Sequence, residues 1–100
     1  QGLCLAVEAL PGTQAMLDFV RLHASLKPDP KGPRGVLYKA PKPGQDRRID
    51  LPTIGPDTVR QAAEAGLGGI AWQAGSVILL DREDAIARAE QAGLFLWSRP

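Results

Sequence analysis

The stretch AAEAGLGGIAWQAGSVILLDRE, from Ala62 to Glu83, decides the fold because it holds two short apolar runs between two helical segments. The runs Gly68–Trp72 and Ser76–Leu80 are rich in aliphatic residues, and each is short enough to be a buried strand. Ala74-Gly75 between them predicts a turn that allows the two strands to pair as a hairpin. Strands that alternate with helices predict an α/β fold.

Helices are expected on both sides of this stretch. One begins at Pro56 or Asp57 and has Gly66 near its end. A second is expected over Arg82–Gln91, with Ile86 and Ala89 facing inward. Its predicted N-cap is Asp81, which forms a capping-box-like start with Asp84, and Gly93 ends the helix. A final strand is expected over Leu94–Trp97.

The first half of the chain adds two expected strands and one helix. Gly2–Ala9 is an apolar run that predicts a buried strand, and Gly35–Ala40 predicts another. Between them, Thr13 is the expected N-cap of a helix from about Gln14 to Leu26. The complete order predicts a small α/β sandwich with a mixed sheet, about five strands and three helices, and one long functional loop.

Composition limits the classes of protein to which the chain can belong. Its 100 residues suffice for one domain, and its net charge of +1 gives no general attraction to nucleic acid. The single cysteine, Cys4, is expected to be buried, and His23 to lie on a helix surface; together they cannot form a zinc site. The chain starts without Met inside a predicted strand, and we therefore expect it to be a piece of a longer protein.

The longest irregular segment runs from Pro41 to Pro56 and holds four prolines and two glycines. Such a segment inside a small domain is usually functional or disordered. It overlaps a cluster of basic residues that suits an anionic ligand: Lys31, Arg34, Lys39, Lys42, Arg47 and Arg48.

Side chains in this segment have the chemistry of a phosphate site. Lys39 and Lys42 lie at the end of a predicted strand, where α/β sheets place ligands, and their ammonium groups suit phosphate oxygens. Gln45 can bond to a diphosphate or a sugar. Asp46 and Asp50 offer carboxylates to a hard cation such as Mg²⁺, or to an attacking water.

Each of these residues also has a purely structural interpretation. The basic residues can be solvated loop charges, Asp46 can be a turn residue, and Asp50 can close an Asx-turn. Thr13 is first a helix cap, and Glu8 is either exposed or paired at a sheet edge. The residues alone therefore establish an α/β domain with a basic, acid-containing loop.

Four segments resemble the C-terminal domain of the UDP-2,3-diacylglucosamine pyrophosphatases of Gram-negative bacteria. They cover nearly the whole chain, in order and at natural spacing: Gly2–Thr13, Gly35–Val59, Ala62–Glu83 and Ala92–Trp97. The most specific of them contains KAPKPGQDRRIDLPTIG (Lys39–Gly55). A chance match of that length is improbable.

The resemblance implies a two-domain hydrolase of lipid A biosynthesis, of which residues 1–100 are the C-terminal catalytic domain. Such enzymes use Mg²⁺ to cleave UDP-2,3-diacylglucosamine into UMP and 2,3-diacylglucosamine 1-phosphate. By this resemblance Asp50 is the catalytic residue and a metal ligand. The residues implied to contact substrate or phosphate are Lys39, Lys42, Gln45, Asp46 and Thr13. The implied setting is a homodimer in the cytoplasm, peripheral at the inner membrane, with the substrate bound between this domain and an N-terminal one and the isolated domain inactive.

The chain departs from the family pattern at one turn. Family members usually read Glu-Gly-Thr-Asp where this chain has Pro11-Gly12-Thr13-Gln14. The missing acid favours a second hypothesis, a module that binds a nucleotide-sugar or phosphate without hydrolysing it. A third hypothesis is a dimerisation domain. Nucleic-acid binding ranks last, because the basic residues are confined to one loop and no aromatic stripe interleaves them.

Overall fold

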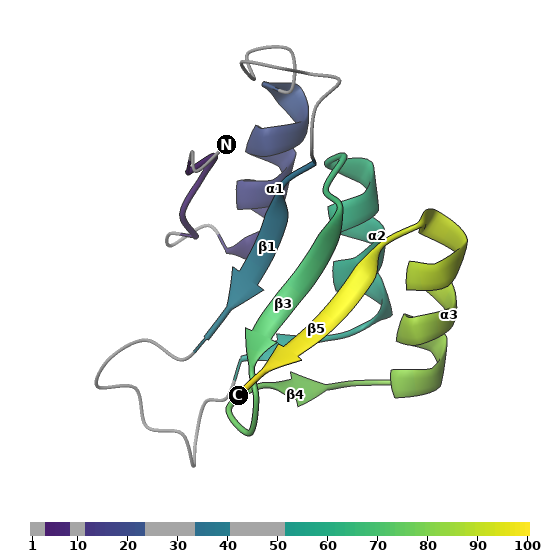
Figure 1. Ribbon diagram of the computed structural model, residues 1–100. Coiled ribbons are helices and arrows are strands. Elements are labelled where there is room, and N and C mark those ends of the chain that lie inside the picture. Colours follow the sequence, from purple (N-terminus) through teal and green to yellow (C-terminus); the bar gives the residue numbers. More distant parts are fainter. Residues whose placement is uncertain (1–3, 9–11, 24–33, 41–51) are drawn as a thin grey trace.

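Three parallel strands form the main sheet of the computed structural model, which describes residues 4–8, 12–23, 34–40 and 52–100 (Figure 1). They are β1 (Val36–Lys39), β3 (Gly69–Gln73) and β5 (Phe95–Arg99), in the order β1-β3-β5. Two shorter strands, β2 (Thr53–Ile54) and β4 (Ile78–Leu79), form a second parallel sheet. The predicted α/β class is confirmed.

Three helices accompany the sheet: α1 (Thr13–Leu22), α2 (Pro56–Glu64) and α3 (Arg82–Ala92). Figure 1 shows them behind and beside the main sheet, and each begins near the edge at which the parallel strands end. This is the arrangement that a repeated strand–helix–strand order produces. It brings the starts of three helices and the ends of three strands to one edge of the domain, which we call the carboxyl edge.

Helix α2 begins and ends where the sequence predicts. Pro56 occupies its first turn, where a backbone N–H is not needed, and the Gly55 N–H donates to Thr58 Oγ1 at 3.2 Å. Val59 and Ala62 are buried on its inner face. After the helix, Gly66 has a φ of 78°, which glycine adopts without a steric cost.

Helix α3 begins at Arg82 after the N-cap Asp81 and ends before Gly93, as predicted, but the predicted side-chain cap is absent. Gly93 is its C-cap, with a φ of 72°, and the Leu94 N–H donates to the Ala89 oxygen at 2.8 Å. Asp81 precedes the helix, yet it has a φ of 46° and its side chain makes no capping hydrogen bond. The predicted capping box is therefore wrong, and the Asp81 backbone oxygen alone begins the helix, accepting from the Ala85 N–H at 2.9 Å. Of the predicted inward residues, Ala89 is buried and Ile86 is partly buried.

The core lies between the helices and the face of the sheet that carries Leu37, Ile70 and Leu96. Ile54, Val59 and Ile70 are the largest side chains that are almost completely buried. Ile54 reaches this core from β2, so the short second sheet contributes to the main core. Sheet and helices therefore share a single hydrophobic cluster.

The opposite face of the sheet carries large side chains that remain half exposed within the described residues. Val36, Tyr38, Phe95 and Trp97 are 45–53% exposed and alternate with the inward residues of β1 and β5. A Cβ atom on Gly69 would overlap the Phe95 ring, so a larger residue in this position of β3 would force the ring to move. Arg99 adds a cation–π contact, with its guanidinium carbon 4.9 Å from the centre of the Trp97 ring.

Two predictions about strands are wrong. Cys4–Glu8, the described part of the predicted strand Gly2–Ala9, forms neither strand nor helix. The predicted hairpin does not form either: β3 pairs with β1 and β5, whereas β4 pairs with β2. The described pairings are all parallel, and the sheet is not mixed. Parallel pairing buries the apolar strand β3 between β1 and β5. A hairpin with the two-residue strand β4 would cover only one side of β3.

The cysteine prediction is also wrong, whereas the histidine prediction is confirmed. Cys4 is exposed, because the segment that holds it is not a buried strand. His23 is exposed at the end of α1, where its ring stacks on Phe19 at 4.2 Å and its Nδ1 lies 2.8 Å from the Phe19 oxygen. Glu8 is exposed as well.

Candidate functional site

Lys39, the last residue of β1, lies at the carboxyl edge of the sheet. It is aligned with Trp72 in β3, which is aligned in turn with Ser98 in β5. In parallel α/β sheets, ligands bind outside these strand ends. The predicted position of Lys39, at a strand end facing a ligand site, is therefore consistent with the fold.

The Lys39 side chain also makes a structural contact. Its Nζ donates a hydrogen bond to the Thr53 oxygen at 3.1 Å, which joins the end of β1 to the start of β2. Residues 41–51, which hold most of the predicted site, lie in the sequence between these two points. An ammonium group has three N–H donors, and this bond uses one of them.

Thr13 lies at the same edge, but it is not the N-cap of α1 that the sequence predicts. The N-cap of α1 is Gly12, whose oxygen accepts from the Met16 N–H at 3.2 Å, and Thr13 is the first residue of the helix. Gly12 has a φ of 96°, a conformation that favours glycine over threonine at the cap. Gln14, in the next position, is exposed, and the first turn of α1 contains no acidic residue.

Arg82 is a candidate that sequence reasoning missed. It is the first residue of α3 and therefore lies near the carboxyl edge. Within the described part of the chain it takes part in none of the ion pairs, in contrast to Arg60 and Arg88, which pair with acids on their own helices. The sequence did contain a signal for this position. Arg82 directly follows the predicted N-cap Asp81, and in an α/β fold the helices begin at the edge where the strands end.

The other predicted site residues lie outside the described residues. They are Lys42, Gln45, Asp46 and Asp50. Within the described ranges, no group of three or more His, Cys, Asp or Glu side chains could hold a metal ion. Carboxylate oxygens such as those of Asp46 and Asp50 are the ligands that Mg²⁺ prefers.

The sequence of the chain matches a known protein family. A family model described as the LpxI C-terminal domain matches residues 1–97. The chain belongs to the LpxI C-terminal domain family. The matched range includes β1, the segment 41–51 and the helices α1, α2 and α3, so the family assignment covers the core and all of the carboxyl edge except the last two residues of β5.

One curated relative of this LpxI domain is the UDP-2,3-diacylglucosamine pyrophosphatase LpxI of Caulobacter vibrioides. The two are 50% identical over 97 residues, which are 96% of this chain and 35% of the relative. The chain thus spans about a third of the length of the relative that it matches. Among the described residues of the LpxI domain, no helix has the length and apolar character required to cross a membrane.

Proposed function

We propose that the full-length protein carrying this domain hydrolyses UDP-2,3-diacylglucosamine to UMP and 2,3-diacylglucosamine 1-phosphate, a step of lipid A biosynthesis. The observation that carries the proposal is the 50% identity to a UDP-2,3-diacylglucosamine pyrophosphatase over 96% of the chain. The geometry supports it, because Lys39, whose ammonium group suits phosphate oxygens, lies at the strand-end edge of the sheet.

The proposed roles follow the chemistry of the side chains. Lys39 and Lys42 bind the diphosphate oxygens, and Gln45 donates to the diphosphate or the sugar. Thr13, at the start of α1, is proposed as a further polar contact. Asp50 orients the attacking water and accepts its proton, so that the oxygen attacks the phosphorus on the uridine side.

Magnesium is proposed as the cofactor, with Asp50 and its neighbour Asp46 as the residues that would hold it. When bound, Mg²⁺ would neutralise charge on the diphosphate oxygens and make the phosphorus a better electrophile. The described residues offer no alternative metal cluster, so these two carboxylates are the ones to test.

The experiment is release of UMP by the full-length protein in the presence of Mg²⁺, compared with its Asp50→Asn variant. Loss of a catalytic acid or base lowers the rate by about 10²–10⁴-fold, and we expect a loss of this size in kcat. The matched control is Asp57→Asn. The Asp57 side chain is 85% exposed and lies 3.9 Å from Arg60, so its substitution should leave turnover unchanged.

Two outcomes would contradict the proposal. If the wild-type protein binds the lipid nucleotide but releases no UMP, the domain is part of a binding protein. If Asp50→Asn retains the wild-type rate, hydrolysis is real but Asp50 is not its catalytic residue.

The non-catalytic binding module remains a second candidate because of α1. Its first turn presents the neutral Gln14 where family members usually have an acid. If that acid contributes to metal binding in the family, Gln14→Asp should lower the Mg²⁺ concentration needed for half-maximal activity. A binding module predicts no activity with either residue.

The remaining proposals concern the assembled protein. We propose a second, N-terminal domain that completes the site, so that residues 1–100 alone are inactive. We also propose a homodimer in the cytoplasm, held at the surface of the inner membrane, where a diacylated substrate would be found. Gel filtration and cosedimentation with vesicles test these two statements separately.

A further inference from the structure

The face of the main sheet that points away from the helices is apolar. Val36 and Tyr38 of β1 and Phe95 and Trp97 of β5 are 45–53% exposed on it. Figure 1 shows the helices α1, α2 and α3 behind and beside the sheet, so none of these helices covers this face. We call the surface formed by the four side chains the open face. Its residues are absent from the site proposed above.

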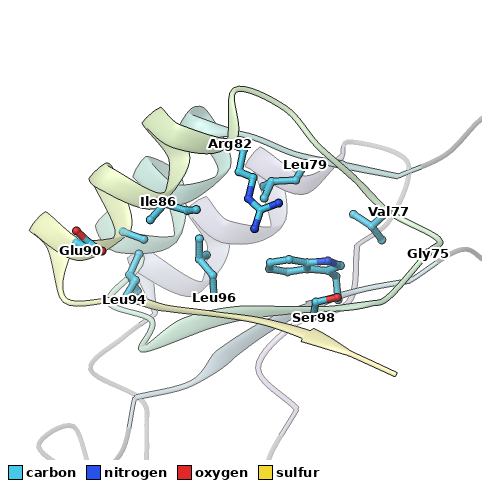
Figure 2. A pocket seen from close by; sticks show the side chains of 11 residues that line it. Gly75, Val77, Leu79, Arg82, Ile86, Glu90, Leu94, Leu96 and Ser98 are labelled. Atoms are coloured by element: carbon cyan, nitrogen blue, oxygen red, sulfur yellow. The ribbon is translucent and has the colours of Figure 1, made fainter.

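The alternation of side chains along each strand determines which residues form the open face. Figure 2 shows Leu96 and Ser98 on the side of β5 that faces α3. Leu96 packs against the core there. Successive side chains of a strand point to opposite faces, so Phe95 and Trp97 point away from the core.

The central strand contributes only small residues in the middle of the open face. A Cβ atom on Gly69 would overlap the Phe95 ring, so this ring lies across β3. Ala71, which is aligned with Tyr38 and Trp97, is only 4% exposed although it belongs to this face. The side chains of β1 and β5 therefore close over β3, and the open face is one continuous apolar layer.

An exposed apolar face is unusual for a sheet of this kind. Sheets whose strands are all parallel occur almost only in proteins that cover both faces. The strands β1, β3 and β5 pair in parallel, and the helices cover one face of them. Aromatic side chains are also enriched at surfaces that become buried in contacts. The open face is therefore expected to be covered in the full-length protein.

The size of the open face distinguishes between possible partners. A fully buried aromatic side chain covers about 150–250 Å², so four half-exposed side chains present roughly 400 Å². A stable complex of separate chains buries about 800 Å² on each partner. Interfaces between domains of one chain bury about 600–1,500 Å² in total, which is roughly 300–750 Å² on each side. The open face therefore has the size of a contact within one chain.

Polypeptide for such a contact is expected to precede this domain. The matched family is described as a C-terminal domain, and the chain covers only 35% of its Caulobacter relative. The matched residues, 1–97, include all four side chains of the open face. A segment joined to the same chain has an effective concentration of about millimolar, so a small apolar contact is sufficient to hold it.

We infer that the open face is the surface on which the polypeptide preceding this domain packs in the full-length protein. Apolar side chains of that polypeptide contact Tyr38 and Trp97. Arg99, whose guanidinium carbon lies 4.9 Å from the centre of the Trp97 ring, forms the polar rim at the carboxyl end of the face. Docking on this face goes beyond the proposed function and does not depend on hydrolysis.

The first test identifies what lies on the open face. The photo-crosslinking residue p-benzoylphenylalanine replaces Tyr38 in the full-length protein, and mass spectrometry locates the residue to which it becomes joined. We expect a cross-link within one chain, to a position that precedes this domain. The control is the same replacement at Leu22, which is 68% exposed on α1 and should not join to that position.

The second test measures protection of the open face. Val36→Cys and Ile78→Cys place a thiol on β1 and β4 in a Cys4→Ser background, and the native side chains are 49% and 41% exposed. Val36→Cys should react with a maleimide at least about tenfold more slowly than Ile78→Cys, because docking leaves its thiol accessible in about one molecule in ten or fewer. Trp97→Asp should remove most of this protection, whereas Leu22→Asp should not. Thermal unfolding shows that each variant is folded.

Three results would overturn the inference. A cross-link from position 38 to another residue within 1–100 would show that the domain covers its own sheet. A cross-link between two chains would make the open face a dimer interface. Equal maleimide rates at positions 36 and 78 would show that the face stays open. None of these measurements uses hydrolysis, so a protein that releases no UMP would refute the proposed function and leave the docking surface in place.

Discussion

The Thr53 oxygen accepts a hydrogen bond from Lys39 Nζ at 3.1 Å, so one side chain joins the two described ends of the segment that holds the proposed catalytic residue. This bond ties the end of β1 to the start of β2. Lys39 is also the proposed phosphate-binding residue at this edge. The stability of the domain and the affinity for the substrate are therefore expected to change together when Lys39 is altered.

Lys39→Met tests this coupling. The variant keeps an unbranched side chain but loses the donor to Thr53, and a lost hydrogen bond of this kind costs about 1 kcal/mol. We expect a small decrease in the free energy of unfolding and a larger effect on KM for the lipid nucleotide. Arg60→Met, on the exposed side of α2, should change neither KM nor kcat. A normal KM in folded Lys39→Met would exclude Lys39 from the phosphate site.

Gly69→Ala should destabilise the sheet, because the added methyl group would overlap the Phe95 ring. Overpacking of this kind costs about 1–3 kcal/mol. In a Phe95→Ala background the overlap is absent, so the same substitution should cost much less. Urea unfolding of the two single variants and the double variant measures the difference. Equal costs in both backgrounds would show that the ring does not restrict this position.

Ile54→Ala and Ile78→Ala are the same chemical change in neighbouring strands. Ile54 is 1% exposed and Ile78 is 41% exposed. Removing the buried side chain should cost about 2–5 kcal/mol, whereas removing the exposed one should cost less than about 1 kcal/mol. Thermal unfolding compares them. Similar costs would mean that β2 does not contribute to the main core.

Gly93→Ala should lower stability by about 1 kcal/mol through the backbone alone. Gly93 has a φ of 72°, and a Cβ atom there would meet nothing within 4 Å. The expected cost therefore comes from the left-handed conformation. Asparagine tolerates this conformation better than alanine. The unfolding temperature of Gly93→Asn should therefore lie between those of the wild-type protein and Gly93→Ala. Greater stability of the alanine variant than of the asparagine variant would contradict this explanation.

Local signals in the sequence were sufficient for most of the fold. Pro56 and Gly93 each act within one helical turn, and they correctly mark the start of α2 and the end of α3. The apolar run at Gly68–Trp72 correctly predicts the central strand. Such signals depend on neighbouring residues, which a single sequence contains.

Strand pairing could not be obtained in this way. Residues 53–54 pair with residues 78–79, and the sequence of a two-residue strand carries almost no periodic pattern. The turn Ala74-Gly75 favours a hairpin locally, but burying β3 between β1 and β5 removes more apolar surface from water. The predicted strand at Gly2–Ala9 failed for a related reason, because composition alone does not supply a partner strand.

Only part of the candidate site could be predicted from the sequence. Lys39 follows from its place at a strand end, and Thr13 lies at the same edge although it is not the cap. Arg82 was missed, since it belongs to no motif and its place at the carboxyl edge follows only from where α3 begins. The assignments of Lys42, Gln45, Asp46 and Asp50 remain predictions.

The central strand β3 takes one partner from the sequence before it and the other from the sequence after it. A truncated chain that stops before Phe95 would keep β1 and β3 but would leave one row of β3 N–H and C=O groups without partners. An unpaired strand edge recruits other chains. Products of premature termination are therefore expected in the insoluble fraction or as substrates of cellular proteases, and a soluble domain should be recovered only when β5 is complete.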